Sequence, residues 1–522
     1  MATNLAVVSG PSPSGGTFSA HQRITGLQKD EIVIALCGPL GTPLHEVAEA
    51  FKEQLESKDF GYTHVEVIRL SRVIRTQAKL SDGATIKQLI DAGNDLRDSH
   101  GAGFLAQHAI KHIFTQRQKH FPADAADGQG GLFETGSTAP AVVPTKSGRV
   151  CHIIDSIKNS QELRLLRQVY GDMLHVVGVY TPIEQRIDRL SRNPNSKDDI
   201  HALIDRDSGE EMAHGQRVQE TFPQADFFLR ADAGTSSQLE ARVKRFLALM
   251  LGTSIITPTQ SERAMYEAFS AARNSACLSR QVGAAIADKD GHVLATGWND
   301  VPRAFGGLYE TIDMRTSPDV DHRCWNKDGG KCFNDEEKTF LAQQVIGKLA
   351  EAKVIQPQDV GRATELIRHD SQLRSLIEFS RAVHAEMHAL LNASTSYGGR
   401  IREGKLFVTT YPCHSCARHI VAAGIAEVYF LEPYRKSLAT KLHGDAITES
   451  ETDTKKVRIM PFDGVAPSRF LKFFGYPESG RKDQASGRMI TGSPQPVMSI
   501  TMEAVTTLEG LVIKELESSD GH

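Results

Sequence analysis

The sequence predicts an α/β protein with separate domains, and three observations lead to that prediction. The chain has 522 residues, a length that indicates two or three domains. Its hydrophobic content of 40% and charged content of 24% are typical of a globular protein. Apolar runs of strand length alternate with amphipathic stretches at helical spacing, which in the first half predicts a largely parallel sheet.

Residues 28–252 contain the elements of one α/β domain. The run "EIVIALCG" predicts a buried strand, "LHEVAEAFKEQLES" a helix and "THVEVIRL" a second strand, and together they predict a right-handed βαβ unit. Two further strands, "VCHIIDSI" and "MLHVVGVY", flank the helix "SQELRLLRQVYG", and the helix "LEARVKRFLALMLG" closes the domain. Residues 124–149 are predicted to form a loop.

The second half begins after a predicted linker at residues 253–260. The helix "ERAMYEAFSAARNS" comes first, and "VGAAIAD" and "HVLATGW", joined by "KDG", predict a β-hairpin. A charged stretch at residues 318–338 precedes a helix that carries "HAEMHALL". Strand "KLFVTTY", helix "HSCARHIVAAG" and strand "EVYFLEPY" follow, so that residues 261–475 form a second domain and residues 476–522 a C-terminal extension.

Composition excludes several classes of protein. Residues 1–27 are rich in Gly, Ser and Pro, and we expect a disordered tail there, without a signal peptide. No apolar run approaches the length of a membrane span, so a cytoplasmic protein is expected. The seven cysteines are odd in number and few for this length, which argues against a disulfide framework. A net charge of −4 argues against a broad electrostatic grip on nucleic acid.

Two short motifs of the second half predict a catalytic zinc site. His384 and Glu386 lie at the start of a predicted helix, whereas Cys413 and Cys416 lie where a strand ends and a helix begins. Thiolates are stabilised at a helix N-terminus, and three protein ligands leave the fourth tetrahedral position open, as catalysis requires. Zinc lowers the pKa of water toward 7, and Glu386, two residues from His384, can shuttle the proton.

Other interpretations of these motifs are less favoured. A chance pairing of the two motifs is improbable, because Pro412 and the helix–strand–helix context accompany them. A structural zinc site would more often offer a fourth Cys or His beside the first three. His388, one helical turn beyond His384, is the nearest rival ligand.

The same segments resemble a known family. "SRQVGAAIADKDGHVLATGWNDVP", "HAEMHAL" and "PCHSCARHIVAAGIAEVYF" are similar to the deoxycytidylate deaminases, within the cytidine deaminase α/β/α fold, over roughly residues 261–440. The resemblance implies zinc bound by His384, Cys413 and Cys416, with Glu386 as the proton carrier. It also implies a substrate contact from Asn299 in "GWNDVP". The chain departs from the family at His388, where an asparagine is usual.

A second, structural zinc ion is a further expectation. Cys277 matches a position that some phage deoxycytidylate deaminases use for such a metal, and "DHRCWNKDGGKC" adds His322, Cys324 and Cys332. Four such ligands would make a closed site. The alternative is that these are free cysteines in a charged loop.

The stretch "CGPLGTPL" stands where a phosphate-binding loop would, between a strand and a helix. Gly38 and Gly41 are present, but Leu44 and His45 occupy the positions of the lysine and the hydroxyl residue in a working loop. Residues 30–250 also show a diffuse similarity to nucleotide kinases. The first half is therefore interpreted as a P-loop kinase-like domain with a degenerate phosphate loop, retained for regulation, or as a scaffold for oligomerisation.

This two-part layout is similar to that of bacterial anti-phage dCTP deaminases, which join a kinase-like domain to a deaminase domain. The resemblance implies conversion of dCTP and dCMP to dUTP and dUMP, which depletes the dCTP pool during phage infection. It also implies control by a small regulatory RNA or an allosteric dNTP, and a homo-oligomer. The alternatives are a polynucleotide cytidine deaminase acting on RNA or DNA, and a nucleotide-sensing or RNA-binding regulator.

The phosphate tail of a nucleotide needs cations beside the zinc site. Arg280, Arg303, Arg435 and Lys436 are the candidates in the family-like segments, and Arg435 with Lys436 is the preferred pair, because both follow "EVYFLEPY". The alternative for that pair is a solvated surface position.

Overall fold

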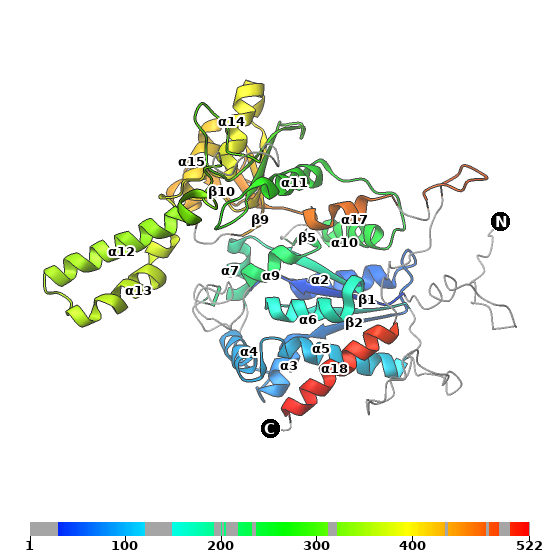
Figure 1. The fold of residues 1–522 in the computed structure, drawn as a ribbon. Helices are drawn as coiled ribbons and strands as arrows, with labels where there is room; N and C mark the ends of the chain where they lie inside the picture. The colour runs from blue at the N-terminus through cyan, green and yellow to red at the C-terminus, as the bar shows by residue number, and fades with distance from the viewer. Residues whose placement is uncertain are drawn as a thin grey trace.

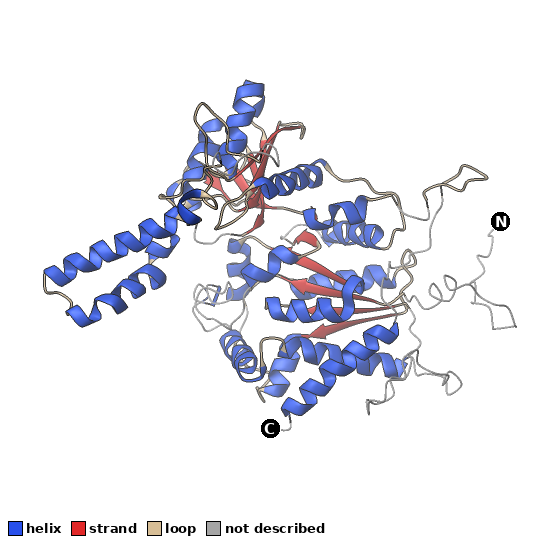
Figure 2. Cartoon of the chain, viewed as in Figure 1, coloured by secondary structure: helices blue, strands red, loops and turns tan. Residues whose placement is uncertain are grey.

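The computed structural model describes residues 30–120, 149–192, 200, 203–204, 218–231, 236–311, 321–433, 437–476, 480–489 and 502–520. Two six-stranded sheets with helices on both faces organise this part of the chain (Figures 1 and 2). The predicted α/β class and the predominance of parallel pairing are confirmed. The predicted tail and most of the predicted loop at residues 124–149 lie outside the described residues. None of the helices among the described residues has the length and apolar character needed to cross a membrane.

The first half contains the following elements, in chain order: β1 (Ile32–Cys37), α2 (Leu44–Glu56), β2 (His64–Arg69), α3 (Leu70–Gln77), α4 (Ile86–His100), α5 (Phe104–His120), β3 (Val150–Asp155), α6 (Ser160–Tyr170), β4 (Leu174–Tyr180), α7 (Ile183–Ser191), α9 (Val218–Thr221), β5 (Phe227–Arg230) and α10 (Ser236–Met250).

The first sheet has the strand order β12-β5-β4-β1-β3-β2 and is parallel except at β12. The predicted β1–α2–β2 unit is present, but its strands are not neighbours, because β3 pairs in parallel with both. Every residue of β1 is buried, and successive side chains enter two different cores. A strand covered on both faces has no polar side to display, and this explains its uninterrupted apolar sequence.

The second half contains α11 (Gln260–Ala271), β6 (Gly283–Ala287), β7 (Val293–Trp298), α12 (Phe333–Glu351), α13 (Val360–Asp370), α14 (Ala385–Tyr397), β8 (Lys405–Thr410), α15 (His414–Ala423), β9 (Glu427–Glu432), α16 (Ala439–Leu442), β10 (Ile447–Thr448), β11 (Val457–Pro461), β12 (Gly464–Val465), α17 (Phe470–Phe474) and α18 (Met502–Asp520). All but β12 of its strands form the second sheet, in the order β10-β11-β9-β8-β6-β7. The predicted hairpin of β6 and β7 is confirmed as an antiparallel pair.

Two glycines allow helices to approach the second sheet closely from opposite faces. A Cβ atom on Gly283 would lie 1.9 Å from the carbonyl oxygen of Ala268 in α11. A Cβ atom on Gly297 would lie 2.3 Å from the backbone nitrogen of Ala389 in α14. Neither position can accept a side chain without moving a helix, so these glycines set the spacing of the α/β/α layers around the catalytic motifs.

The charged stretch expected at residues 318–338 reaches a helix only at its end, because α12 begins at Phe333, and α12 forms a helical hairpin with α13. Helices α12 and α13 pack on each other and project away from the second sheet (Figure 1). Their charged sequence follows from this exposure, because only a narrow set of side chains on each helix is buried. The sequence-based interpretation missed both helices.

The C-terminal part of the chain returns to the first half. Strand β12 pairs antiparallel with β5, and α18 lies against α5 (Figure 1). Arg117 of α5 connects them further, because its buried guanidinium donates to Glu31 at 2.9 Å and to Glu509 of α18 at 3.0 Å. The predicted domain boundaries stay predictions, but these contacts tie residues beyond 460 to the first sheet.

His175 in β4 provides a pH-dependent test of this junction. Its ring centroid lies 6.4 Å from that of Phe246 in α10 and 6.4 Å from that of Phe473 in α17. Burial lowers the pKa of His175 to about 4, with Asp226 opposing this shift and Lys472 adding to it. The neutral ring is therefore favoured in the folded chain.

We predict that the stability due to neutral His175 is fully present above its unfolded pKa of about 6.5 and is lost as the pH falls through 4, by roughly 2–3 kcal/mol. Chemical denaturation from pH 7 to pH 4 should show a steeper loss for the parent than for His175→Gln. The exposed control His292→Gln should follow the parent. Parallel curves for the parent and His175→Gln would contradict this assignment.

Candidate active site

The two predicted motifs meet at the N-termini of two helices. His384 is the N-cap residue of α14, and Cys413 is the N-cap residue of α15. The sulfur of Cys413 accepts a hydrogen bond from the backbone N–H of Cys416 at 3.4 Å, as a capping side chain does. Tight packing of α14 on β7 and the position of α15 directly after β8 hold these two helix ends together.

The three proposed ligand atoms have the spacing of a metal site. The Nδ1 atom of His384 lies 3.5 Å from Sγ of Cys413 and 3.3 Å from Sγ of Cys416. Zinc–sulfur and zinc–nitrogen bond lengths at tetrahedral angles place such atoms about 3.5 Å apart. All three ligand atoms lie within 4.8 Å of one another. The residues therefore fit a zinc ion with one position left for water or substrate.

Within the cluster, the Cys413 thiol has the environment that favours its ionised form. A hydrogen bond with Cys416, followed by the His384 contact, lowers the pKa of the Cys413 thiol to about 4. The thiolate is the form that binds a metal. The same pairing raises the pKa of Cys416, whose thiol is also buried. A hydrogen bond with Cys413 raises the pKa of His384 to about 9.

Glu386 has the environment of a proton-transfer group. It is only 4% exposed, and burial raises the pKa of its carboxyl group above the ordinary value. A carboxyl group whose pKa moves toward neutrality can both take up and release a proton during a reaction. Its place in the first turn of α14 sets it beside the three proposed ligands.

A cavity of about 270 Å³ opens beside these residues. Its walls include His384, Glu386 and Cys413. Further parts of the walls come from the loop at 277–282, the start of α12 and the segment at 377–382. The predicted residues Asn299 and Arg280 both line this cavity.

Asn299 holds the cavity loop in place with both ends of its amide. Its side-chain oxygen accepts the backbone N–H of Val282 at 2.7 Å, and its nitrogen donates to the carbonyl oxygen of Arg280 at 2.9 Å. Each amide atom keeps one further hydrogen-bonding position. Its predicted contact with a substrate stays a prediction, and the structure adds a role in shaping the loop.

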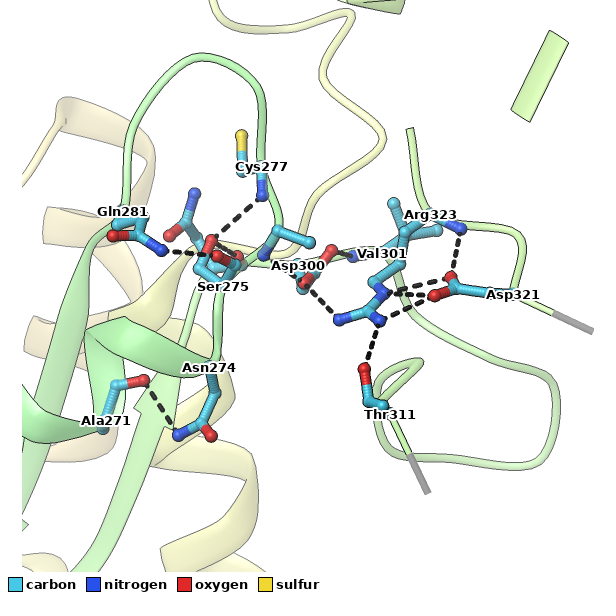
Figure 3. A network of polar contacts seen from close by, with 12 residues as sticks. Ala271, Asn274, Ser275, Cys277, Gln281, Asp300, Val301, Thr311, Asp321 and Arg323 are labelled. Carbon is cyan, nitrogen blue, oxygen red and sulfur yellow. Dashed lines mark hydrogen bonds and ion pairs between the residues drawn. The ribbon is translucent and has the colours of Figure 1, made fainter. Parts of the chain in front are cut away.

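A buried ion pair fixes the same loop from behind (Figure 3). Asp300 accepts the backbone N–H of Ala276 at 2.9 Å, and its carboxylate lies 3.8 Å from the guanidinium of Arg323. Arg323 is held in turn by Asp321 at 2.6 Å. The backbone carbonyl of Asp300 also accepts the N–H of Val383, next to His384, at 2.9 Å. Asp300, held by Arg323, thus orients both the cavity loop and the strand-like segment that leads to His384.

The four residues of the expected second zinc site are only partly brought together. Cys277, Cys324 and Cys332 line the cavity, and burial chiefly raises the pKa of the Cys324 thiol, with Cys277 and Cys332 adding to this shift. Within the described ranges, however, the only groups of three close potential ligands are the His384 group and a group of the buried Asp288 with the exposed Asp290 and His292. The structural zinc stays a prediction.

The other predicted cations fall outside the cavity or outside the described residues. Arg435 and Lys436 are not among the described residues. Arg303 is exposed and donates to the carbonyl oxygen of Gly306 within its own turn. Among the predicted cations that are described, Arg280 alone lines the cavity, and its Nη2 lies 3.0 Å from the Glu432 carboxylate.

Sequence reasoning missed two side chains of the cavity wall, Arg381 and Tyr411. Both are adjacent to the recognised motifs, because Arg381 stands three residues before His384 and Tyr411 two residues before Cys413. This proximity was the available signal. The hydroxyl of Tyr411 donates to Glu449 at 2.9 Å. Glu449 lines a second cavity, which also includes residues 182–185 of the first half.

His388, the rival ligand, uses both ring nitrogens in contacts with Trp298 and Asn392. Its Nδ1 accepts the backbone N–H of Trp298 at 3.1 Å, and its Nε2 lies 3.1 Å from the side-chain amide of Asn392. Burial lowers the pKa of this histidine, which favours the neutral ring. His388 therefore acts as a buried link between α14 and β7.

The predicted phosphate loop lies between β1 and α2, and two of its carbonyl groups accept hydrogen bonds from cationic side chains of the protein. Lys158 Nζ donates to the carbonyl oxygen of Gly38 at 2.8 Å, and Arg186 Nε donates to that of Leu40 at 2.7 Å. Gly41 adopts a φ of +86°, with Arg186 so close that a Cβ atom would approach it to 3.0 Å. A loop that cradles phosphate points backbone N–H groups inward, whereas these carbonyl groups face cations of the protein itself.

Comparisons with known proteins agree with the zinc-site geometry. The family model described as the cytidine and deoxycytidylate deaminase zinc-binding region matches residues 258–432. ComE operon protein 2 of Bacillus subtilis (strain 168) is 41% identical over 56 residues, which make up 11% of this chain and 29% of that protein. The deoxycytidylate deaminase of Enterobacteria phage T2 is 26% identical over 178 residues, which make up 33% of this chain and 78% of that enzyme.

Among solved structures, the dCMP deaminase of cyanophage S-TIM5 in complex with dCMP and dUMP covers 40% of this chain and 99% of its own, with 20% identity and a TM-score of 0.23. The family model and the phage relatives show that residues 258–432 are similar to the zinc-binding region of cytidine and deoxycytidylate deaminases. Within that class, the phage relatives are deoxycytidylate deaminases.

We predict that Cys413→Ala and Cys416→Ala each lose about one zinc ion per chain, because two remaining ligands hold zinc poorly. Metal content measured by plasma emission on the purified full chain checks this. Ser415→Ala, in the same turn of α15, should keep the parent's zinc. Retention of full zinc content by both cysteine variants would contradict the site assignment.

Proposed function

We propose that this chain is a zinc-dependent enzyme that hydrolytically deaminates deoxycytidine nucleotides. The observation that supports this most directly is the convergence of His384, Cys413 and Cys416 around one point, with the buried Glu386 carboxyl beside them at the cavity. The reaction adds water at C4 of the cytosine ring and releases the amino group as ammonia, which leaves a uracil nucleotide.

In this proposal each residue has a separate task. When bound, zinc supplies a Lewis acid that lowers the pKa of water toward neutrality. Glu386 would take up one proton of the attacking water and deliver it to ring atom N3, and would then take up the remaining hydroxyl proton and deliver it to the departing amino group. Its raised pKa suits both directions of transfer. Asn299 and the loop that it holds orient the base.

The substrates that we propose are dCMP and dCTP, converted to dUMP and dUTP. This choice of substrates is supported by the phage relatives, which are deoxycytidylate deaminases, and by the arginines that line the cavity. One catalytic zinc ion per chain is part of the proposal, with a second structural ion at Cys277, His322, Cys324 and Cys332.

For the first half we propose a P-loop kinase-like domain that regulates the deaminase. Its parallel sheet and the strand–loop–helix order at β1 and α2 support the fold, whereas Lys158 and Arg186 occupy the loop and Leu44 replaces its lysine. Contacts between the halves provide a route for regulation. Tyr180 at the end of β4 packs against Phe430 of β9, and Phe430 packs against Tyr411 of the catalytic cavity.

The biological role that we propose is depletion of the dCTP pool in the cytoplasm as a defence against phage. The resemblance to anti-phage enzymes of the same two-part layout supports it, and that resemblance extends to a homo-oligomer and to control by a dNTP or a small RNA.

The proposal is tested by incubating the purified chain with dCTP, dCMP, CTP, deoxycytidine and cytosine-containing oligonucleotides, and by measuring released ammonia and uracil products. We expect deamination of dCMP or dCTP to exceed that of every oligonucleotide by at least about tenfold in kcat/KM. Deamination of oligonucleotides alone would replace the proposal with the polynucleotide alternative.

We predict that Glu386→Gln lowers kcat by at least about a thousandfold while zinc stays bound, because Glu386 moves protons and is not a ligand. Steady-state kinetics and metal analysis on the same sample check this. A variant that keeps a tenth of the parent's kcat would remove Glu386 from the mechanism.

We predict that Leu44→Lys does not create a phosphotransferase, because the carbonyl groups of Gly38 and Leu40 remain paired with Lys158 and Arg186. Transfer of radiolabelled phosphate from ATP to deoxynucleotides checks this, with Leu44→Met as the control for buried-site disruption. Phosphoryl transfer by the parent chain would contradict a purely regulatory first half.

A further inference from the structure

Part of the cavity lining lies outside the proposed zinc site. It comes from the 277–280 loop, from Cys324 and Cys332, from Phe333 and Asn334 at the start of α12, and from the segment at 380–382. Among the described residues, the arginines of this lining are Arg280 and Arg381. A nucleotide whose base lies at Glu386 needs a cation for its phosphate, so these two arginines are the groups to compare.

The two arginines differ in how their charges are used. The guanidinium of Arg280 forms an ion pair with the Glu432 carboxylate, with 3.0 Å between Nη2 and Oε2. Arg381 instead donates to the backbone carbonyl of His322 at 3.2 Å, and its guanidinium carbon lies 5.0 Å from the ring centroid of Phe333. Within the part of the chain that the structure describes, no carboxylate forms an ion pair with Arg381. The guanidinium also contacts the Cys324 thiol and opposes the rise in its pKa, but no described carboxylate neutralises the charge of Arg381.

The position of Arg381 relative to the zinc ligands is fixed by the backbone. Val383, which lies between Arg381 and His384, forms a β-bridge with Asp300. The carboxylate of Asp300 pairs with the buried Arg323 guanidinium. Three residues separate Arg381 from His384, so their Cα atoms lie at most about 11 Å apart. This is the length scale of one mononucleotide, and the cation–π contact with Phe333 restrains the guanidinium beside the cavity.

We propose that Arg381, stacked on Phe333, binds the phosphate of the substrate and makes this cavity specific for nucleotides over nucleosides. The inference rests on the proposed function and names the substrate group that the chain recognises. A guanidinium offers a phosphate two parallel N–H donors, a geometry that an ammonium group lacks. Phe333 begins α12, so the projecting α12–α13 hairpin contributes to the active site through its base.

The test compares Arg381→Gln and Arg381→Lys with the parent, using dCMP, dCTP and deoxycytidine as substrates. Arg418→Gln is the matched control, because Arg418 is an exposed arginine of α15 that does not line the cavity. We expect Arg381→Gln to raise KM for both nucleotides by about tenfold or more, with kcat and zinc content unchanged. Arg381→Lys should recover part of that loss.

The nucleoside separates recognition of phosphate from a structural role. For deoxycytidine, kcat/KM of Arg381→Gln should stay within about twofold of the parent value. Equal losses for nucleotides and nucleoside would show a structural role and overturn the proposal. Nucleotide KM values equal to those of Arg418→Gln would also overturn it.

Equilibrium binding distinguishes failure of this inference from failure of the proposed function. Titration of dCMP into Glu386→Gln and into Glu386→Gln/Arg381→Gln measures phosphate recognition without turnover. At least about tenfold weaker binding by the double variant supports Arg381 even if the parent deaminates no deoxycytidine nucleotide, a result that would refute the proposed function alone. Equal affinity of the two variants overturns the role of Arg381.

Discussion

The site depends on one constraint, which is that the N-termini of α14 and α15 meet at the strand ends of the second sheet. His384 and Cys413 are both N-cap residues, so the position of their side chains follows from the placement of α14 and α15. Gly297 allows α14 to lie against β7, and Asp300 with Arg323 fixes the approach to His384. Ligand atoms held within 3.5 Å of His384 Nδ1 by this scaffold are preorganised for a tetrahedral metal.

The first half is built into the same unit through contacts that cross the chain. Strand β12 extends the first sheet, and α18 places Glu509 beside the buried Arg117. At the other side, the Tyr411 hydroxyl joins the catalytic cavity to Glu449 and thereby to a second cavity bordered by residues 182–185. These packed side chains are the route by which the proposed regulation would reach the cavity, without a phosphate bound at Gly38.

The sequence predicted what depends on local pattern. Apolar runs located the central strands, and the spacing of His384, Glu386, Cys413 and Cys416 identified four residues that the structure brings together. Tertiary context decided the rest. The position of β3 between β1 and β2, the return of β12 and the charged α12–α13 hairpin depend on distant contacts that periodicity does not report. Arg381 escaped notice because its proposed role depends on tertiary pairing: Glu432 pairs with Arg280, whereas Arg381 has no carboxylate partner among the described residues.

The central claim is that one zinc ion lies between His384, Cys413 and Cys416 and faces the substrate base. Crystals of Glu386→Gln grown with dCMP, measured on both sides of the zinc absorption edge, test this most directly. The account predicts an anomalous peak about 2.0–2.3 Å from His384 Nδ1 and from both sulfur atoms, with the cytosine ring beside it. Absence of a peak there, or a peak only at Cys324 and Cys332, would contradict the account.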